Sequence, residues 1–130
     1  MSSAAQAPIE YNEMFEKATT QTHSSYAQSK LALTMWSFSL AKQFANIAVI
    51  PVNPGSLLDT RMVREGFGQI WSPAEKGGDI IYDLAVGEKH KSVTGKYFDN
   101  DKGSYGKAHP DAYDDGKIET LINKTEAFFA

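Results

Sequence analysis

The feature that most constrains the fold is a long apolar stretch, residues 24–46, which contains no glycine or proline. Two serines, Ser24 and Ser25, stand at its start and can cap a helix. At 1.5 Å per residue, a helix of this length spans about 30 Å. Its apolar residues do not keep to one narrow stripe, so we expect a central helix that is buried on more than one side.

Tyr26 and Lys30 stand one turn apart on this predicted helix. The i,i+4 spacing puts them about 40° apart on one face, so a phenol and an ammonium can act on one reacting atom. The chain holds a second pair with this spacing, Tyr113 and Lys117, in a polar segment rich in aspartate. An isolated pair is most simply two solvated neighbours. The apolar helix and the strand and Pro-Gly turn that follow it favour a function for Tyr26 and Lys30.

Two segments have the pattern of strands. Residues 47–53 form an unbroken β-branched run typical of a strand covered on both faces, although Pro51 removes one backbone donor. Residues 93–98 predict a second strand, and residues 103–107 a turn-rich loop. A loop with one helical turn at 10–17 is expected within residues 8–23.

Two further helices follow the first strand. Ser72, Pro73 and Glu75 predict a helix start with a capping box, and Gly87 predicts its end. We expect four residues of this helix to face inward: Ile80, Ile81, Leu84 and Ala85. A last helix is predicted from Pro110, with an amphipathic face made of Ile118, Leu121, Ile122 and Phe128. Alternation of helices and strands favours βα units around a parallel sheet.

Several of these features occur together in one known family. The order Ser3, Tyr26-Ala-Gln-Ser-Lys30, a strand ending in Asn53-Pro54-Gly55, and a final strand over residues 94–98 resembles the C-terminal half of the short-chain dehydrogenase/reductase family. The retinol-dehydrogenase-like and protochlorophyllide-reductase-like branch is the most similar. The resemblance covers essentially all 130 residues. It implies one partial domain, residues 1–130: an α/β fold that is the C-terminal half of a Rossmann-type doubly wound parallel sheet, lacking the N-terminal nucleotide-binding βαβ units.

The resemblance implies three catalytic residues. Ser3 would hold the substrate oxygen, Tyr26 would be the general acid/base, and Lys30 would bind the nicotinamide ribose and lower the pKa of the tyrosine. The chemistry agrees, because free tyrosine and lysine titrate near 10 and a nearby cation favours the phenolate. A serine hydroxyl can stabilise charge that develops on a carbonyl oxygen. The alternative for Ser3 is an ordinary terminal serine.

The cofactor implied is NAD or NADP. Pro54 and Gly55 match the turn that passes under the nicotinamide ring, and Thr60 the threonine that contacts its carboxamide, although Thr60 stands one residue later than in the family pattern. The apolar segment 56–71 resembles the substrate lid of the family. We expect it to line a pocket for a small apolar alcohol or carbonyl compound through Leu57, Met62, Phe67 and Trp71.

No strand, glycine-rich turn and helix that could receive the phosphates of a dinucleotide occur in the sequence. Gly66 and Gly68 follow no strand, and Gly77 and Gly78 fall within a helix pattern, so we interpret them as loop or packing glycines. We therefore expect a truncated reductase that neither binds a dinucleotide tightly nor turns over by itself. Its unmatched apolar faces predict a homo-oligomer or pairing with a missing N-terminal half.

Composition excludes other classes of protein. No apolar run approaches the length of a membrane span, and a net charge of −3 with mixed signs does not favour nucleic acid. The N-terminal residues lack the pattern of a secretory signal, and the absence of cysteine fits a reducing compartment, so we expect a cytoplasmic protein. The three histidines lack ligand spacing, so no metal site is predicted.

A function of a different class is open to the same sequence. The chain can be a non-enzymatic module that pairs with another chain through the long helix between Tyr26 and Phe44. In the family that it resembles, this helix commonly packs against its counterpart in a second subunit. Trp36, Phe38 and Phe44 are then the candidates for the paired surface.

Overall fold

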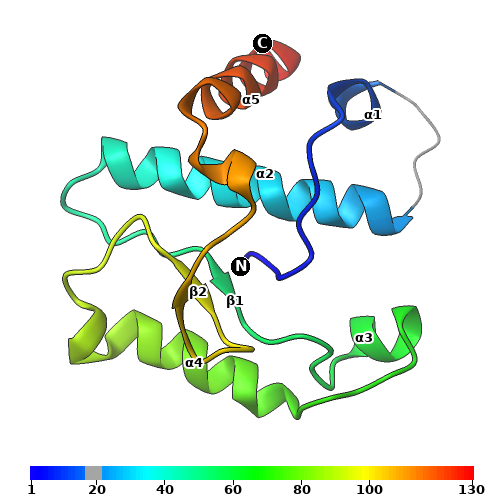
Figure 1. The fold of residues 1–130 in the computed structure, drawn as a ribbon, viewed down its shortest axis with the longest axis vertical. Coiled ribbons are helices and arrows are strands. Elements are labelled where there is room, and N and C mark those ends of the chain that lie inside the picture. The colour runs from blue at the N-terminus through cyan, green and yellow to red at the C-terminus, as the bar shows by residue number, and fades with distance from the viewer. Residues whose placement is uncertain (17–21) are drawn as a thin grey trace.

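A computed structural model describes residues 1–16 and 22–130 as a mixed α/β fold (Figure 1). Within these residues there are five α-helices: α1 (Tyr11–Phe15), α2 (Thr22–Gln43), α3 (Arg61–Gly66), α4 (Ala74–Val86) and α5 (Asp115–Phe129). The strands are β1 (Val52–Asn53), β2 (Tyr97–Asp99) and β3 (Ser104–Gly106). Two 3-10 helices complete the order, η1 (Glu88–His90) and η2 (Pro110–Tyr113).

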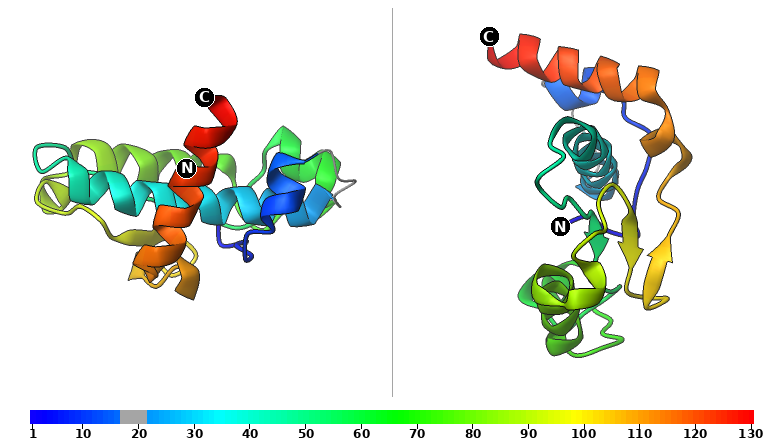
Figure 2. Two further views of the ribbon diagram at one scale, coloured as in Figure 1. Left: turned by 90° about the horizontal axis from the view of Figure 1, so that it is seen from above. Right: turned by 90° about the vertical axis from the view of Figure 1, so that its left-hand side faces the viewer.

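The elements lie in layers. Figure 1 shows the sheet between α2 on one side and α4 on the other, and the side view of Figure 2 shows α5 packed outside α2. Helices on both faces of a sheet are the arrangement typical of doubly wound α/β folds. The long helix is therefore central, as its sequence predicts.

The sheet is mixed and its order is β1-β2-β3. β1 and β2 are parallel, with Val52 opposite Phe98, whereas β2 and β3 are antiparallel. The prediction of a loop at residues 103–107 was wrong, because Gly103, at a φ of 64°, turns the chain back into a hairpin.

Both predicted strands are shorter than expected. β1 is limited to residues 52–53, and Ile47 is 51% exposed because it lies in the turn that follows α2. A backbone hydrogen bond from Gly95 to the Val49 carbonyl still holds the two segments side by side. Gly95 has a φ of 65°, and this bend delays the start of β2 to Tyr97.

The core lies under one face of α2, where Leu31, Met35 and Phe38 are buried. They form one cluster with residues of β2, η2 and α5: Tyr97, Ala112, Ile118 and Leu121. Other sides of α2 are less covered than the sequence predicts, since Trp36 is half exposed. No helix in residues 1–16 or 22–130 is long and apolar enough to cross a membrane.

The later helices differ from the predictions at their starts. α4 begins at Ala74 without a side-chain cap, because Ser72 instead pairs with the segment at Leu58, and it ends at Gly87 as predicted. Its Ile81 and Ala85 are exposed rather than inward.

Pro110 starts the 3-10 helix η2, and α5 begins only after its N-cap Asp114. Ile118 and Leu121 are buried as predicted, but Phe128 is 56% exposed.

The N-terminal segments were partly predicted. α1 confirms a helical turn within residues 10–16, and residues 17–21 of the predicted loop lie outside the described residues. The prediction of a loop up to residue 23 was wrong, because α2 already begins at Thr22. The connection over residues 56–71 is not structureless, since it contains α3, whose N-cap Thr60 accepts a hydrogen bond from the Val63 backbone.

Candidate functional site

A cavity of about 340 Å³ lies where α2, the end of β1, α3, α4 and the N-terminal segment meet. Its wall includes seven of the site residues predicted from the sequence: Ser3, Tyr26, Lys30, Pro54, Gly55, Thr60 and Met62. These residues come from segments that lie far apart in the chain. The structure thus brings all three expected catalytic side chains and all the expected cofactor contacts to one cavity.

Tyr26 and Lys30 meet on the first turns of α2. The Lys30 ammonium lies 5.3 Å from the centroid of the Tyr26 ring. It also donates a hydrogen bond of 3.4 Å to the Met1 carbonyl oxygen. Within the described part of the chain, Lys30 forms no ion pair and the Tyr26 hydroxyl has no hydrogen-bond partner. A phenol beside an unneutralised cation is suited to proton transfer with a bound oxygen.

Ser3 reaches the cavity because the segment before it is fixed to β1. The Ser2 backbone N–H donates to the Val52 carbonyl at 2.8 Å, and the Ser2 hydroxyl lies 2.6 Å from the Thr34 hydroxyl. Ser2 is therefore buried and engaged. The Ser3 hydroxyl accepts a hydrogen bond of 3.1 Å from the Ala5 backbone, which leaves its own proton to donate to a ligand.

The backbone of Ser3 has a partner in the core. Its carbonyl oxygen accepts a hydrogen bond of 3.0 Å from the Tyr97 hydroxyl. Burial, together with the nearby carboxylates of Asp99 and Asp101, raises the pKa of Tyr97 well above its usual value. Tyr97 stays protonated and keeps donating this bond throughout the neutral range.

Close packing sets the wall made by β1 and α4. Gly55 has a φ of 133°, a backbone conformation that residues other than glycine rarely adopt. A Cβ atom at Gly77 would lie 2.5 Å from Leu58 Cδ1 and 3.5 Å from Pro54 Cβ. Gly77 is thus a packing glycine, as the sequence predicts, and it allows α4 to approach the Pro54–Gly55 turn.

Three of the four predicted substrate-lining residues lie elsewhere. Met62 lines the cavity, but Leu57, Phe67 and Trp71 lie outside its wall. Phe67 packs edge-on against His23 at 5.3 Å between ring centroids, and Trp71 is 70% exposed. α3 turns the segment so that its later apolar residues face away, whereas Leu58 and Val63 face the cavity instead. Leu58 is as apolar as its neighbour Leu57, and the sequence contained no signal that distinguishes the two.

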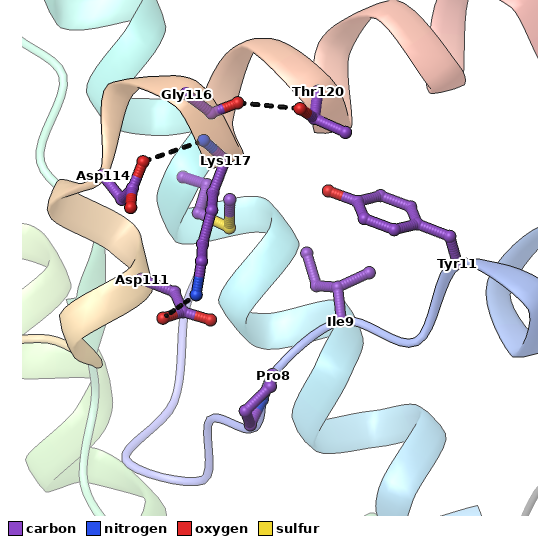
Figure 3. Close-up of a pocket in the computed structure, with 9 residues that line it drawn as sticks. Pro8, Ile9, Tyr11, Asp111, Asp114, Gly116, Lys117 and Thr120 are labelled. Carbon is purple, nitrogen blue, oxygen red and sulfur yellow. Dashed lines mark hydrogen bonds and ion pairs between the residues drawn. The ribbon is translucent and has the colours of Figure 1, made fainter.

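A second cavity, of about 330 Å³, lies between the N-terminal segment and the start of α5 (Figure 3). Here the Lys117 ammonium donates a hydrogen bond of 2.7 Å to Asp111. The Tyr113 hydroxyl, from the same Tyr-x-x-x-Lys pair, accepts one of 2.9 Å from the Ala108 backbone. Both polar groups of this pair are therefore used within the protein.

Comparison of the chain with protein-family models, curated proteins and solved structures found no match. The candidate site therefore rests on its own residues and geometry.

Proposed function

We propose that this chain is the catalytic half of an NAD(P)-dependent oxidoreductase of the short-chain dehydrogenase/reductase type, which interconverts an alcohol and a carbonyl. The observation that carries the proposal is the single cavity that Ser3, Tyr26, Lys30, Pro54 and Gly55 share. The spacing of Tyr26 and Lys30 alone would not support it, because Tyr113 and Lys117 have the same spacing and a different arrangement.

The fold supports the proposal in a general way. β1, α4 and β2 form a parallel βαβ unit, and helices lie on both faces of the sheet (Figure 1). In open α/β sheets, ligands bind outside the carboxyl ends of the strands. Asn53, the last residue of β1, lines the cavity, so the site occupies that position. We accordingly interpret the fold as the C-terminal half of a Rossmann-type sheet.

The cavity fits part of the cofactor. A volume of about 340 Å³ is near the lower end of the range of ligand pockets, about 300–1,000 Å³. It suits a nicotinamide ring and its ribose rather than a whole dinucleotide. Lys30 would bind the ribose, and Pro54, Gly55 and Thr60 would contact the nicotinamide. NAD or NADP, when bound, would supply or accept the hydride.

The residues of the chain would handle the proton. Tyr26 donates its phenolic proton to the carbonyl oxygen of the substrate, and Ser3 donates a hydrogen bond to that same oxygen. Tyr26 is then a phenolate, and the Lys30 ammonium lies 5.3 Å from the centroid of its ring. In the direction of alcohol oxidation the phenolate takes the proton back. Leu58, Met62, Val63 and Ile81 give the cavity an apolar wall, which favours a small apolar alcohol or carbonyl compound as substrate.

Titration with NADH and NADPH, followed by nicotinamide fluorescence, tests the proposal. It should be made on the 130-residue chain and again on the chain fused to an N-terminal nucleotide-binding half of the short-chain dehydrogenase/reductase type. We expect tight binding and reduction of apolar carbonyl compounds in the fused protein, and loss of reduction in its Tyr26→Phe variant. Absence of binding in both forms would contradict the proposal.

One observation favours the interaction module as a second candidate. Trp36 on α2 is 50% exposed, and Phe44, which directly follows the end of α2 at Gln43, is 44% exposed, so both are accessible to a second copy of the chain. Phe38 was wrongly predicted to share this surface: it is buried, with its ring 5.2 Å from that of Tyr113. Sedimentation of the Trp36→Glu variant tests this candidate. A homodimer formed through α2 should dissociate, and an unchanged mass would exclude Trp36 from the interface.

A further inference from the structure

The turn that forms part of the cavity wall, residues 53–56, is held by side chains from the end of β2. Asp101 accepts hydrogen bonds from the Ser56 backbone at 2.7 Å and from the Ser56 hydroxyl at 2.5 Å. It also accepts one of 2.9 Å from Asn53 Nδ2. These donors stand at the two ends of the turn. One carboxylate therefore ties both ends together.

Asn53 connects this carboxylate to the glycine of the turn. The side chain is only 1% exposed, and its Nδ2 donates to Asp99 Oδ1 as well as to Asp101, each at 2.9 Å. Its Oδ1 accepts a hydrogen bond of 3.2 Å from the Gly55 backbone. Reversing the amide would turn its oxygen toward two carboxylates and its nitrogen toward a donor, so the group has one favourable orientation.

Asn100 fixes the turn from the other side. Its Nδ2 donates to the Pro54 carbonyl at 2.8 Å and to the Lys76 carbonyl of α4 at 3.2 Å. Its backbone N–H donates to the Asn53 carbonyl at 3.0 Å. The segment 99–101 thus joins β1, the turn and α4, which together make one wall of the cavity.

We propose that Asp101 is a positioning residue for this cavity: through Asn53 and Ser56 it fixes the Pro54–Gly55 turn in the shape that receives a nicotinamide ring. Asp101 lies outside the cavity wall and acts through the turn. The identity of the ring rests on the function proposed above. The control of the turn by Asp101 rests on the hydrogen bonds alone.

The charge state of Asp101 suits this role. Partial burial favours its neutral form, but the hydrogen bonds from Ser56 and Asn53 outweigh that effect and hold the pKa of Asp101 below its usual value. It is therefore a carboxylate at neutral pH, an acceptor with capacity for all three donors.

Two measurements on the whole chain test the proposal. The first is amide hydrogen exchange at Gly55 and Ser56, which should quicken at least about tenfold in Asp101→Ala while exchange at Leu121 in α5 stays unchanged. The second is titration with nicotinamide mononucleotide, whose dissociation constant should rise about tenfold in the same variant. Asp111→Ala, which removes a carboxylate at the other cavity, is the matched control and should leave both readouts unchanged.

Variants of Ser56 keep the test valid if Asp101→Ala does not fold. Ser56→Ala should quicken exchange at Gly55 and weaken binding to a smaller extent, and Ser56→Thr, which keeps the hydroxyl, should restore both. Unchanged exchange at Gly55 in Asp101→Ala and Ser56→Ala would overturn the proposal. So would quickened exchange with undiminished binding. If the unaltered chain does not bind the mononucleotide, the statement that the turn receives a nicotinamide ring fails for this chain, and the exchange rates alone decide whether Asp101 controls the turn.

Discussion

Two regions of the molecule carry a tyrosine and a lysine at the same spacing, and the structure uses them differently. Tyr26 and Lys30 lie on one helix and face a cavity, without an ion pair or a phenol hydrogen bond among the described residues. Tyr113 ends η2, and Lys117 lies in α5 beyond Asp114. Identical spacing therefore does not imply identical chemistry.

The two pairs differ in the partners of the lysine ammonium and of the tyrosine hydroxyl. Lys117 is paired with Asp111, which raises the pKa of the lysine and uses its charge (Figure 3). The Tyr113 ring packs on Phe38, and its hydroxyl accepts the Ala108 N–H. The second pair thus fastens η2 and α5 to the core, whereas the first lines a cavity.

The largest expected effect is on turnover. In the chain fused to an N-terminal nucleotide-binding half, Tyr26→Phe should lower carbonyl reduction by at least about 100-fold, because the proposed general acid is lost. Tyr113→Phe should change the rate by less than about twofold, because this phenol has a structural partner. Steady-state kinetics with NADPH and NADH measure both. Equal losses in the two variants would remove the distinction between the pairs.

A smaller effect is expected on binding. Lys30→Met should weaken binding of nicotinamide mononucleotide by about tenfold, since a hydrogen-bonding cation in the cavity is removed. Lys117→Met should leave the affinity unchanged and lower the free energy of unfolding only slightly, because the ion pair that it removes is exposed on the lysine side. Calorimetric titration and urea denaturation distinguish these outcomes. Weaker binding in Lys117→Met would refute the assignment.

Substitutions at the two glycines of α4 test how closely this helix packs on the Pro54–Gly55 turn. Gly77→Ala should destabilise the fold by about 1–2 kcal/mol, because the new Cβ would overlap Leu58 Cδ1. Gly78→Ala has open space around it and should stabilise the helix by about 0.5–1 kcal/mol. Urea denaturation of both variants provides the comparison. Stabilisation by both would show that α4 does not pack closely on the turn.

The smallest effect concerns pH and Tyr97. Its raised pKa means that the unfolded chain loses this proton first, near pH 10, so the free energy of unfolding falls as pH rises above about 10. Tyr97→Phe should reduce that decline, at a cost of about 1 kcal/mol near neutral pH for the lost hydrogen bond to Ser3. Tyr82→Phe, at a residue 70% exposed, is the control. An unchanged pH dependence in Tyr97→Phe would contradict the burial of this phenol in the folded state.

Much of the fold could be predicted because apolar periodicity records which face is buried. It indicated the buried face of α5, whereas α2 was located by its long apolar run without glycine or proline and α4 by its start and stop signals. The alternation of helices and strands along the chain suggested the parallel pairing of β1 and β2. β3 could not be predicted, since three residues beside a glycine turn carry no period. The sequence did not show which side chains of α2 are buried. Phe38 and Trp36 are both large and apolar, but Phe38 is buried because it packs against Tyr113 of η2, whereas Trp36 is half exposed.

The site was predicted in part. The resemblance to a known family suggested Ser3, Tyr26, Lys30 and the Pro54–Gly55 turn, which line one cavity. It gave no sign of Asp101, because hydrogen bonds between residues 45 or more positions apart leave no local pattern. The substrate-lining residues were mostly misplaced for a related reason, since α3 alters the direction of the segment after Thr60.

The most direct test is a map of nicotinamide mononucleotide binding on the ¹⁵N-labelled 130-residue chain. We expect chemical-shift changes at Tyr26, Lys30, Gly55 and Thr60 that saturate together, with Lys117 unaffected. Shifts confined to the region of Lys117, or no saturable shifts at Tyr26 and Lys30, would contradict the claim that these two residues form a cofactor site.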